Sequence, residues 1–487
     1  MSTTRLVERT SSGLIREVEI HPKALAVKIA TRSNPSTSRR IGLYASLVEP
    51  SKKVFLPAGY PESVSPDYLR YQIFNACQAF CSSLAGLLAS RAVLEGFGVG
   101  NADASATNAI LLTVLQDIFG RMTTIVAAYA LGPSLGAEAK VYRLLADITN
   151  DVAVILDVVS PLLLNWSTAP QYARVAALCL AGSMRAICGI CAGGAKAALA
   201  MHFATPAGKT AGGDVGDLNA KDASKETVLG LFGMLTGSLV MRYLTTPRST
   251  NTALLTLVGL HLFLNYLGIR GVVLRTLNRQ RLTIAWTRYR DSLGTDVPNQ
   301  TRNLSPEAIA RAERVLFSPW ETLFGGISGV GTKTRVCFGA SLVDALRVPA
   351  NLKTPVPIPE ILDVLAQERY LIFLHGHGHG WISVYLCLRA GYTPADLLKA
   401  WVHAVEIARL PLASSQFKSE SVGYTELEGI KAAYEKVNEL LPGFVERMRG
   451  VGWDLESSSV SGGLLVGSPS GLVESTSGGS GTGRKEP

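Results

Sequence analysis

The chain has 487 residues and a formal net charge of +9, and only 17% of its residues are charged. Soluble domains usually carry about 25% charged residues. This deficit, together with a mean hydropathy of +0.23, favours a membrane-embedded or very apolar helical protein. The length predicts two or three domains. No aromatic-rich sheet or zinc-binding pattern accompanies the basic residues, which argues against nucleic acid as a partner.

The first 50 residues are predicted to form a polar, partly disordered segment with one short strand at residues 18–20. This segment contains no basic stretch followed by an apolar one, so we expect no cleaved secretory signal. Six apolar segments of helical pattern follow, at residues 66–96, 107–131, 139–164, 173–204, 227–243 and 252–274. About 20 residues cross a bilayer, and every segment except the fifth is clearly long enough. The expected fold is mainly α, with a polytopic membrane-type helical bundle over residues 51–290.

Arginines crowd directly after the sixth segment. They are Arg270, Arg275, Arg279, Arg281, Arg288 and Arg290. By the positive-inside rule, a basic loop of this kind is expected on the cytosolic side of the membrane or its equivalent.

Ionisable residues interrupt the apolar segments at regular spacings. Arg174, Arg185 and Lys196 recur every 11 residues, which is three helical turns, so they fall on one line of the fourth segment. Arg143, Asp147 and Asp151 share a face of the third segment. We expect these two helices to meet in a buried polar seam. The seam is predicted to contain Asp117, Arg121, Arg143, Asp147, Asn150, Asp151, Arg185 and Lys196. The alternative is a soluble bundle on which the same residues form a salt-bridged outer face.

Small residues form a second stripe on the fourth segment. They are Gly182, Ala186, Gly189, Gly193 and Ala197. Such stripes allow helices to approach closely, as membrane helices do.

The remainder of the chain has a different pattern. Residues 304–455 are predicted to form a soluble α+β domain, with strands at 370–374 and 381–388 and helices near 305, at 393–409 and at 427–448. Residues 456–487 are rich in Gly and Ser and are predicted to be disordered.

Local motifs give little support for catalysis. Gly208, Lys209 and Thr210 resemble the end of a phosphate-binding loop, but the required earlier glycine is Phe203. His375, His377 and His379 alternate on an extended segment and could share a metal, although a glycine-rich hairpin is the preferred interpretation. No nucleophile elbow is present. We therefore predict no catalytic residue, no metal site and no cofactor.

Three polar motifs stand out within the apolar region: residues 55–72 (FLPAGYPESVSPDYLRYQ), 143–153 (RLLADITNDVA) and 217–227 (DLNAKDASKET). They resemble the root UVB sensitive family, whose members carry similar motifs, and the similarity continues at residues 98–101 and 277–281. The resemblance implies membrane association and a link to light protection and vitamin B6 homeostasis. It says little about chemistry.

The third motif lies in a polar, Gly-rich stretch at residues 206–224, which is predicted to be a loop. Lys221, Asp222 and Ser224 are candidate functional residues of this loop, and the alternative is that Ser224 caps the fifth helix. Lys196, Lys209 and Lys221 are candidates for a pyridoxal phosphate Schiff base, but no phosphate-binding turn can be assembled around them. Binding or moving a B6 vitamer remains open.

The leading functional hypothesis is a membrane protein that transports or handles a small polar molecule, because ionisable residues inside membranes usually mark functional sites. The alternative is a non-enzymatic membrane scaffold, and a soluble enzyme is a third reading. Membrane lipid and a protein partner or a second copy are the expected partners. The sequence does not identify the small molecule or the organelle.

Overall fold

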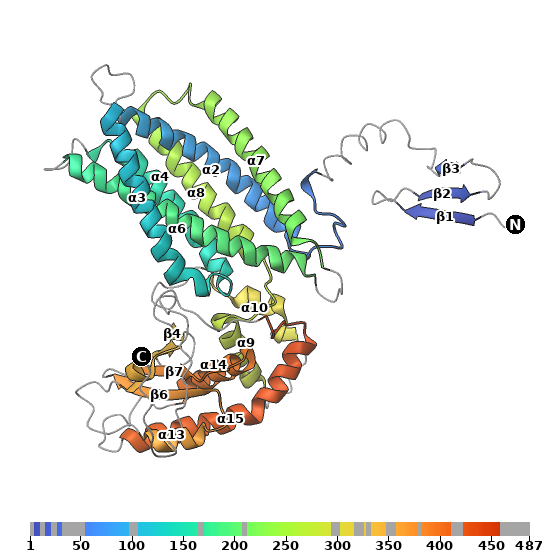
Figure 1. Ribbon diagram of the computed structural model, residues 1–487, viewed down its shortest axis with the longest axis vertical. Coiled ribbons are helices and arrows are strands. Elements are labelled where there is room, and N and C mark those ends of the chain that lie inside the picture. Colours follow the sequence, from blue (N-terminus) through green and yellow to red (C-terminus); the bar gives the residue numbers. More distant parts are fainter. Residues whose placement is uncertain are drawn as a thin grey trace, which may run out of the picture.

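The computed structural model describes residues 4–9, 15–20, 27–31, 54–96, 106–163, 170–206, 212–293, 302–315, 326–327, 333–346, 357–377, 381–410 and 422–457. The protein is mainly helical. A bundle of long helices lies above a smaller unit of helices around a sheet (Figure 1). Residues 458–487 of the expected disordered tail, residues 98–101, Lys209 and His379 lie outside the described residues.

The first strands form a sheet of their own. Strands β1 (Thr4–Arg9), β2 (Ile15–Ile20) and β3 (Val27–Thr31) pair antiparallel in the order β1-β2-β3. The prediction of one short strand in this region was therefore incomplete. Charged and apolar residues alternate over the last four residues of β2, EVEI, with the two-residue period of a strand.

Six of the described helices build the bundle, close to the predicted positions. They are α2 (Tyr68–Gly96), α3 (Ala106–Leu131), α4 (Ala139–Val159), α6 (Pro170–Ala204), α7 (Val215–Val240) and α8 (Pro247–Arg270). The turn η2 (Gly132–Ser134) joins α3 to α4. Helix α4 packs along α6 and α8, α2 packs on α7 and α8, and α3 lies outside α6 (Figure 1).

The start of α7 differs most from the prediction. Asp214 accepts a hydrogen bond from the backbone N–H of Gly216 at 2.7 Å and caps the helix. Because the cap lies ten residues before Ser224, most of the expected loop is the first half of a helix. Helix α8 begins with a capping box between Thr246 and Ser249.

The outer surface of the bundle is apolar. Four of the described helices, α2, α3, α6 and α8, contain stretches that are long and apolar enough to cross a membrane. Large apolar side chains on α3, α7 and α8 are exposed, among them Ile125, Phe232 and Phe263. Exposed apolar side chains in such number mark contact with lipid or with another protein.

Glycines permit two close helix contacts. A Cβ atom on Gly182 of α6 would lie 2.9 Å from the backbone oxygen of Gln116 on α3, and one on Gly233 of α7 would lie 2.9 Å from that of Phe80 on α2. Gly189 and Gly193 of α6 meet nothing within 4 Å. Of these stripe glycines, only Gly182 lies at a close helix contact, so the small-residue stripe of α6 allows close approach at one end and not along its whole length.

The sheet of the lower unit contains β4 (Gly326–Ile327), β5 (Lys333–Phe338), β6 (Tyr370–His377) and β7 (Trp381–Leu388). Its order is β4-β5-β7-β6, with β5 and β7 parallel and the other neighbours antiparallel. The antiparallel pairing of β6 and β7 confirms the hairpin interpretation of the histidine motif. Among the described residues, no group of three or more metal-ligating side chains is found.

Helices surround this sheet. They are α9 (Arg279–Ser292), α10 (Pro306–Ala312), α12 (Leu342–Leu346), α13 (Ile358–Val364), α14 (Pro394–Arg409) and α15 (Val422–Gly450), with the turn η3 (Arg302–Leu304). Trp286 and Tyr289 of α9 pack against Phe444 of α15 in the core. Helix α9, which the sequence assigned to the bundle, thus belongs to the core of the lower unit.

The basic cluster after the sixth segment is largely internal. Arg281 and Lys140 both contact Glu313, and Arg290 lies 3.0 Å from Glu406. Burial tends to raise the pKa of Glu313, but the two cations outweigh it and hold that pKa below its usual value. These cationic side chains are therefore paired inside the protein, and the expectation that the loop lies on the cytosolic side stays a prediction.

Candidate functional site

A partly open cavity of about 490 Å³, lined by both polar and apolar residues, lies between α2, α4, α6, α7 and α8. Polar residues reach it because they share helix faces. On α2, Tyr71, Asn75, Gln78 and Ser82 recur at i, i+4, i+7 and i+11. Tyr71 and Phe203 give the cavity an aromatic wall, with ring centroids 5.2 Å apart.

Asp147 is the centre of the polar network. Its carboxylate accepts a hydrogen bond from Arg143 at 2.7 Å and further hydrogen bonds from the amides of Gln78 and Asn265. Arg143 also donates to Asn75 Oδ1 at 3.1 Å. The two buried charges, one of each sign, are therefore paired and hydrogen-bonded. These interactions offset the free-energy cost of removing ionised groups from water.

His261 connects this centre to a second carboxylate. Its Nδ1 lies 2.8 Å from Asp151, and its Nε2 lies 3.3 Å from the amide nitrogen of Gln78. An amide nitrogen can only donate, so Nε2 accepts and Nδ1 carries the proton that is donated to Asp151. This assignment of the tautomer follows from the partners. His261 and Asp151 are 2% and 4% exposed.

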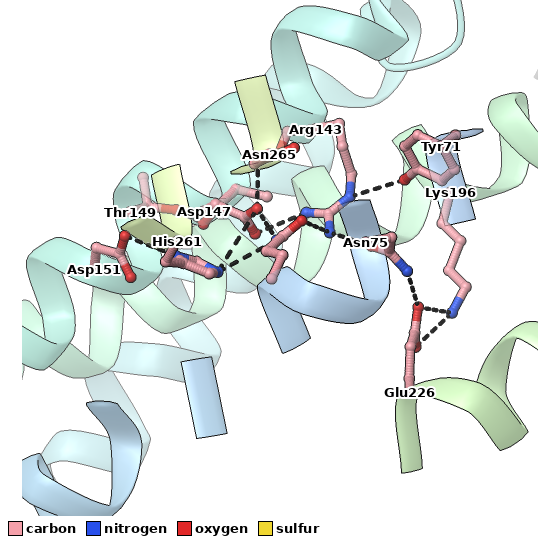
Figure 2. Close-up of polar contacts among 12 residues, drawn as sticks. Tyr71, Asn75, Arg143, Asp147, Thr149, Asp151, Lys196, Glu226, His261 and Asn265 are labelled. Atoms are coloured by element: carbon pink, nitrogen blue, oxygen red, sulfur yellow. Dashed lines mark hydrogen bonds and ion pairs between the residues drawn. The ribbon is translucent and has the colours of Figure 1, made fainter. Parts of the chain in front are cut away.

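The network continues toward the surface. Asn75 donates to Glu226 at 3.1 Å, and Lys196 lies 2.9 Å from the same carboxylate. The side chains of Lys196 and Glu226 are 42% and 37% exposed. Figure 2 shows these polar contacts, from buried Asp151 and His261 through Asp147, Arg143 and Asn75 to the Glu226–Lys196 pair. Gln78 links His261 to Asp147 by a hydrogen bond to each.

A neighbouring cluster anchors α7 to α2. Asp222 accepts hydrogen bonds from Tyr68 at 2.9 Å and from Gln72 at 2.7 Å, and it forms an ion pair with Lys225 at 2.7 Å. Asp222 also lines the cavity. This cluster joins the first polar motif to the third.

The turn before α2 is held in the same way. The backbone N–H of Ala58 donates to Asp217 at 2.7 Å, and Asp67 accepts from His202 at 3.0 Å and from the backbone of Val273 at 2.8 Å. The turn therefore closes one end of the bundle beside the cavity.

The structure brings together part of the predicted seam. Arg143, Asp147 and Asp151 form the network described above, and Asn150 and Lys196 line the cavity. Lys196, however, pairs with α7 and not with an acidic residue of α4. Arg185 pairs with Asp157 of α4, away from the cavity.

Asp117 and Arg121 are not part of the seam. Both side chains are exposed on α3. The reason is that α3 packs on α6 through Gln116, Gly120 and Thr123, which lie on a different face of the helix.

The expected functional loop is also corrected. Lys221, Asp222 and Ser224 lie within α7. Asp222 is buried at the cavity, Lys221 is half-buried, and Ser224 donates to the backbone oxygen of Ala220 one turn earlier and does not cap a helix.

Sequence reasoning missed five network residues: Asn75, Gln78, Glu226, His261 and Asn265. A signal was present for two of them. His261 and Asn265 are polar residues at i and i+4 in the most apolar part of α8, so they share a face. Their carboxylate partners, more than 100 residues away, could not be read from that spacing.

The cavity offers hydrogen-bond donors, acceptors, charges of both signs and an aromatic wall. Such a lining suits a small polar molecule, and pockets for small ligands commonly measure about 300–1,000 Å³. The three polar motifs of the sequence meet here, since Tyr71, Asp147 and Asp222 all line the cavity.

Comparison with known proteins agrees with the resemblance of these motifs. The vitamin B6 photo-protection and homoeostasis domain matches residues 43–292. Root UVB sensitive 3 of Arabidopsis thaliana is 28% identical over 407 residues, which are 83% of this chain and 82% of the relative. RUS family member 1 of Dictyostelium discoideum is 34% identical over 280 residues, 57% of this chain and 49% of the relative.

Root UVB sensitive 2 of Arabidopsis thaliana, which is named as chloroplastic, is 24% identical over 410 residues, 84% of this chain and 82% of the relative. No solved structure matches the chain. The matched domain covers half of the chain and contains the helices around the cavity, so the protein belongs to the root UVB sensitive family.

Proposed function

We propose that the helical bundle is embedded in a membrane and that its cavity binds a small polar molecule and moves it across. The observation that carries this proposal is a polar, charge-bearing cavity inside a bundle whose outer surface is apolar. Ionisable groups inside a membrane are costly, and they usually mark a pathway for a substrate or an ion.

The family suggests the class of ligand. Its domain is described by vitamin B6 photo-protection and homoeostasis. A B6 vitamer is a substituted pyridine with a phenolic hydroxyl and a hydroxymethyl group. Its ring could stack on Tyr71 or Phe203, and its polar groups could reach Asn150 and Lys196, which also line the cavity. We propose the unphosphorylated vitamers, because the cations at the cavity are already paired with carboxylates.

The Lys196–Glu226 pair supports an entrance at the α6–α7 side. It is the most exposed part of the polar network and joins two different helices. An exposed ion pair is weak, typically about 0–1 kcal/mol, so it can open at little cost. The buried Arg143–Asp147 pair, in contrast, would remain as the floor of the cavity.

Membrane insertion is tested first, by washing membranes that contain the full-length chain with alkaline carbonate. The chain is expected to stay in the pellet. Release into the supernatant would contradict insertion and would favour the scaffold or a soluble enzyme.

Transport is tested with tritiated pyridoxine and proteoliposomes of the full-length chain. Gly230 lines the cavity and a Cβ there meets nothing within 4 Å, so Gly230→Leu adds apolar volume to the cavity. Uptake is expected to fall at least about tenfold, because the ligand and the leucine compete for the same volume.

Gly259→Leu is the matched control. Gly259 lies on the exposed side of α8 and also meets nothing within 4 Å, so this leucine would only add to the apolar surface. Equal uptake by both variants would exclude the cavity as the path, and absence of uptake of pyridoxine, pyridoxal and pyridoxamine by the wild-type chain would exclude this ligand class.

A further inference from the structure

The outward face of α3 has no role in the proposed function. The inward side of this helix meets α6 at Gly182, and Thr123 donates to Ser183 at 3.0 Å. The opposite side carries a stripe at helical spacing, which we call the α3 stripe. It consists of Val114, Asp117, Ile118, Arg121, Met122 and Ile125, and all six side chains are exposed.

Two opposite charges lie in the middle of this apolar stripe. Among the described residues, neither Asp117 nor Arg121 takes part in an ion pair or a hydrogen bond. In lipid the two charges would have no partner except each other, and in water the apolar side chains would be left exposed to solvent. The outward face of α7 is different, since residues 227–241 contain no ionisable side chain and lipid alone suits them. The α3 stripe therefore needs a cover that is apolar and also carries both charges.

We propose that a second copy of this chain covers the α3 stripe, through antiparallel pairing of the two α3 helices. Asp117 and Arg121 lie one helical turn apart. A two-fold axis level with residue 119 places Asp117 of each copy opposite Arg121 of the other. Val114 then lies close to the level of Ile125 of the other copy, so the apolar residues also cover one another. A stripe with this pattern is complementary to itself, as an isologous dimer interface must be.

This proposal goes beyond the proposed function and does not depend on a ligand. It holds whether α3 faces lipid or water, because both surroundings leave part of the stripe unsatisfied. Charge complementarity selects the occupant: lipid has no fixed charges at this spacing, whereas a second α3 has one of each sign at the right positions.

Charge reversal tests the pairing on the full-length chain, by light scattering across a dilution series in detergent and again in nanodiscs. The wild-type chain is expected to be a dimer. Asp117→Arg and Arg121→Asp are each expected to weaken the dimer at least about tenfold, because each places like charges opposite one another. The double variant, Asp117→Arg with Arg121→Asp, restores opposite charges and is expected to return to within about threefold of the wild type.

Two results would overturn the proposal. One is a wild-type chain that is monomeric throughout the series, which would leave the stripe to lipid or to a different protein. The other is a double variant that dimerises no better than the single variants. Misfolding is not expected to confuse the result, because both side chains are exposed, and circular dichroism checks that the helix content is unchanged.

Disulfide cross-linking tests the direction of pairing. Along antiparallel helices centred at residue 119, the two copies of residue 118 are offset by about 3 Å and the two copies of residue 125 by about 18 Å. Ile118→Cys is therefore expected to give a covalent dimer, and Ile125→Cys is not, although Ile125 is the more exposed side chain, 70% against 48%. Efficient cross-linking at residue 125 would overturn the antiparallel arrangement. The unsubstituted chain gives the background from the seven native cysteines.

Discussion

Replacing Glu313 by Gln is expected to destabilise the contact between the bundle and the lower unit. Glu313 lies 2.6 Å from Lys140 of α4, and Arg281 Nε of α9 lies 3.1 Å away, close enough for an ion pair. The three side chains are only 4%, 3% and 2% exposed. Removing this carboxylate takes away the ion-pair partner that the two buried cations share.

The burial sets the size of this effect. Breaking a buried ion pair by removing one partner costs about 3–5 kcal/mol, because the remaining charge is poorly solvated. About 2 °C or more of melting temperature is lost per kcal/mol in a domain of about 150–250 residues. The melting temperature of Glu313→Gln, followed by intrinsic tryptophan fluorescence in detergent, is therefore expected to fall by about 6 °C or more.

Glu439→Gln is the matched control. Glu439 forms an ion pair with Lys436 at 2.7 Å, but these side chains are 62% and 40% exposed. Exposed pairs contribute about 0–1 kcal/mol, so this variant should melt close to the wild type. If Glu313→Gln melts no lower than Glu439→Gln, the argument from burial is wrong.

The pH dependence gives a second check on Glu313. Its folded-state pKa lies below its usual value, so its contribution is present above the pKa of the unfolded carboxyl and is lost as the pH falls through the folded pKa. The difference in stability between wild type and Glu313→Gln should therefore shrink in acid. A gap that is the same at neutral and acidic pH would contradict this role.

Two further effects follow from the packing and the burial. Gly182→Ala should lower the melting temperature, since its Cβ would come within 2.9 Å of the backbone of Gln116. Gly189→Ala is on the same helix but in open space, so it should stabilise the protein by about 0.5–1 kcal/mol. A change of stability in the same direction for both variants would refute the close α3–α6 contact. Burial lowers the pKa of His403 to about 4. The stability contributed by the neutral side chain is therefore fully present above the ordinary pKa of about 6.5 and is lost as the pH falls toward 4. The expected loss in the free energy of unfolding is about 2–3 kcal/mol between pH 7.5 and 4.5. Urea unfolding of wild type and His403→Gln measures this loss, and identical pH slopes would refute it.

Much of the helical architecture could be predicted from the sequence. The predicted segments agree with α3, α4, α6 and α8 to within a few residues at most ends, because long apolar runs and caps are local signals. The start of α7 was missed. Its first half is as polar as a loop, and it is helical because Asp214 caps it and Asp222 is held by Tyr68 and Gln72 of α2.

The candidate site was predicted only in part. The helical period placed Arg143, Asp147 and Asp151 on one face, and that face lines the network. Asp117 and Arg121 were added because charged residues of membrane helices are expected to face the bundle interior, and the structure places them on the outward side of α3. Periodicity says which residues share a face, but it does not say toward which neighbour the face turns.

The sequence by itself determined the family, the apolar character of the helices and the residues that share each helix face, because these depend on neighbours within a few turns. Tertiary structure decided which faces meet. His261 reaches Asp151 across 110 residues of chain, and Lys196 pairs with α7 although an acidic helix lies beside it. The physical reason is that helix packing is set by the fit of whole surfaces, including close contacts such as that at Gly182, and polar side chains take the partners that this packing brings within reach.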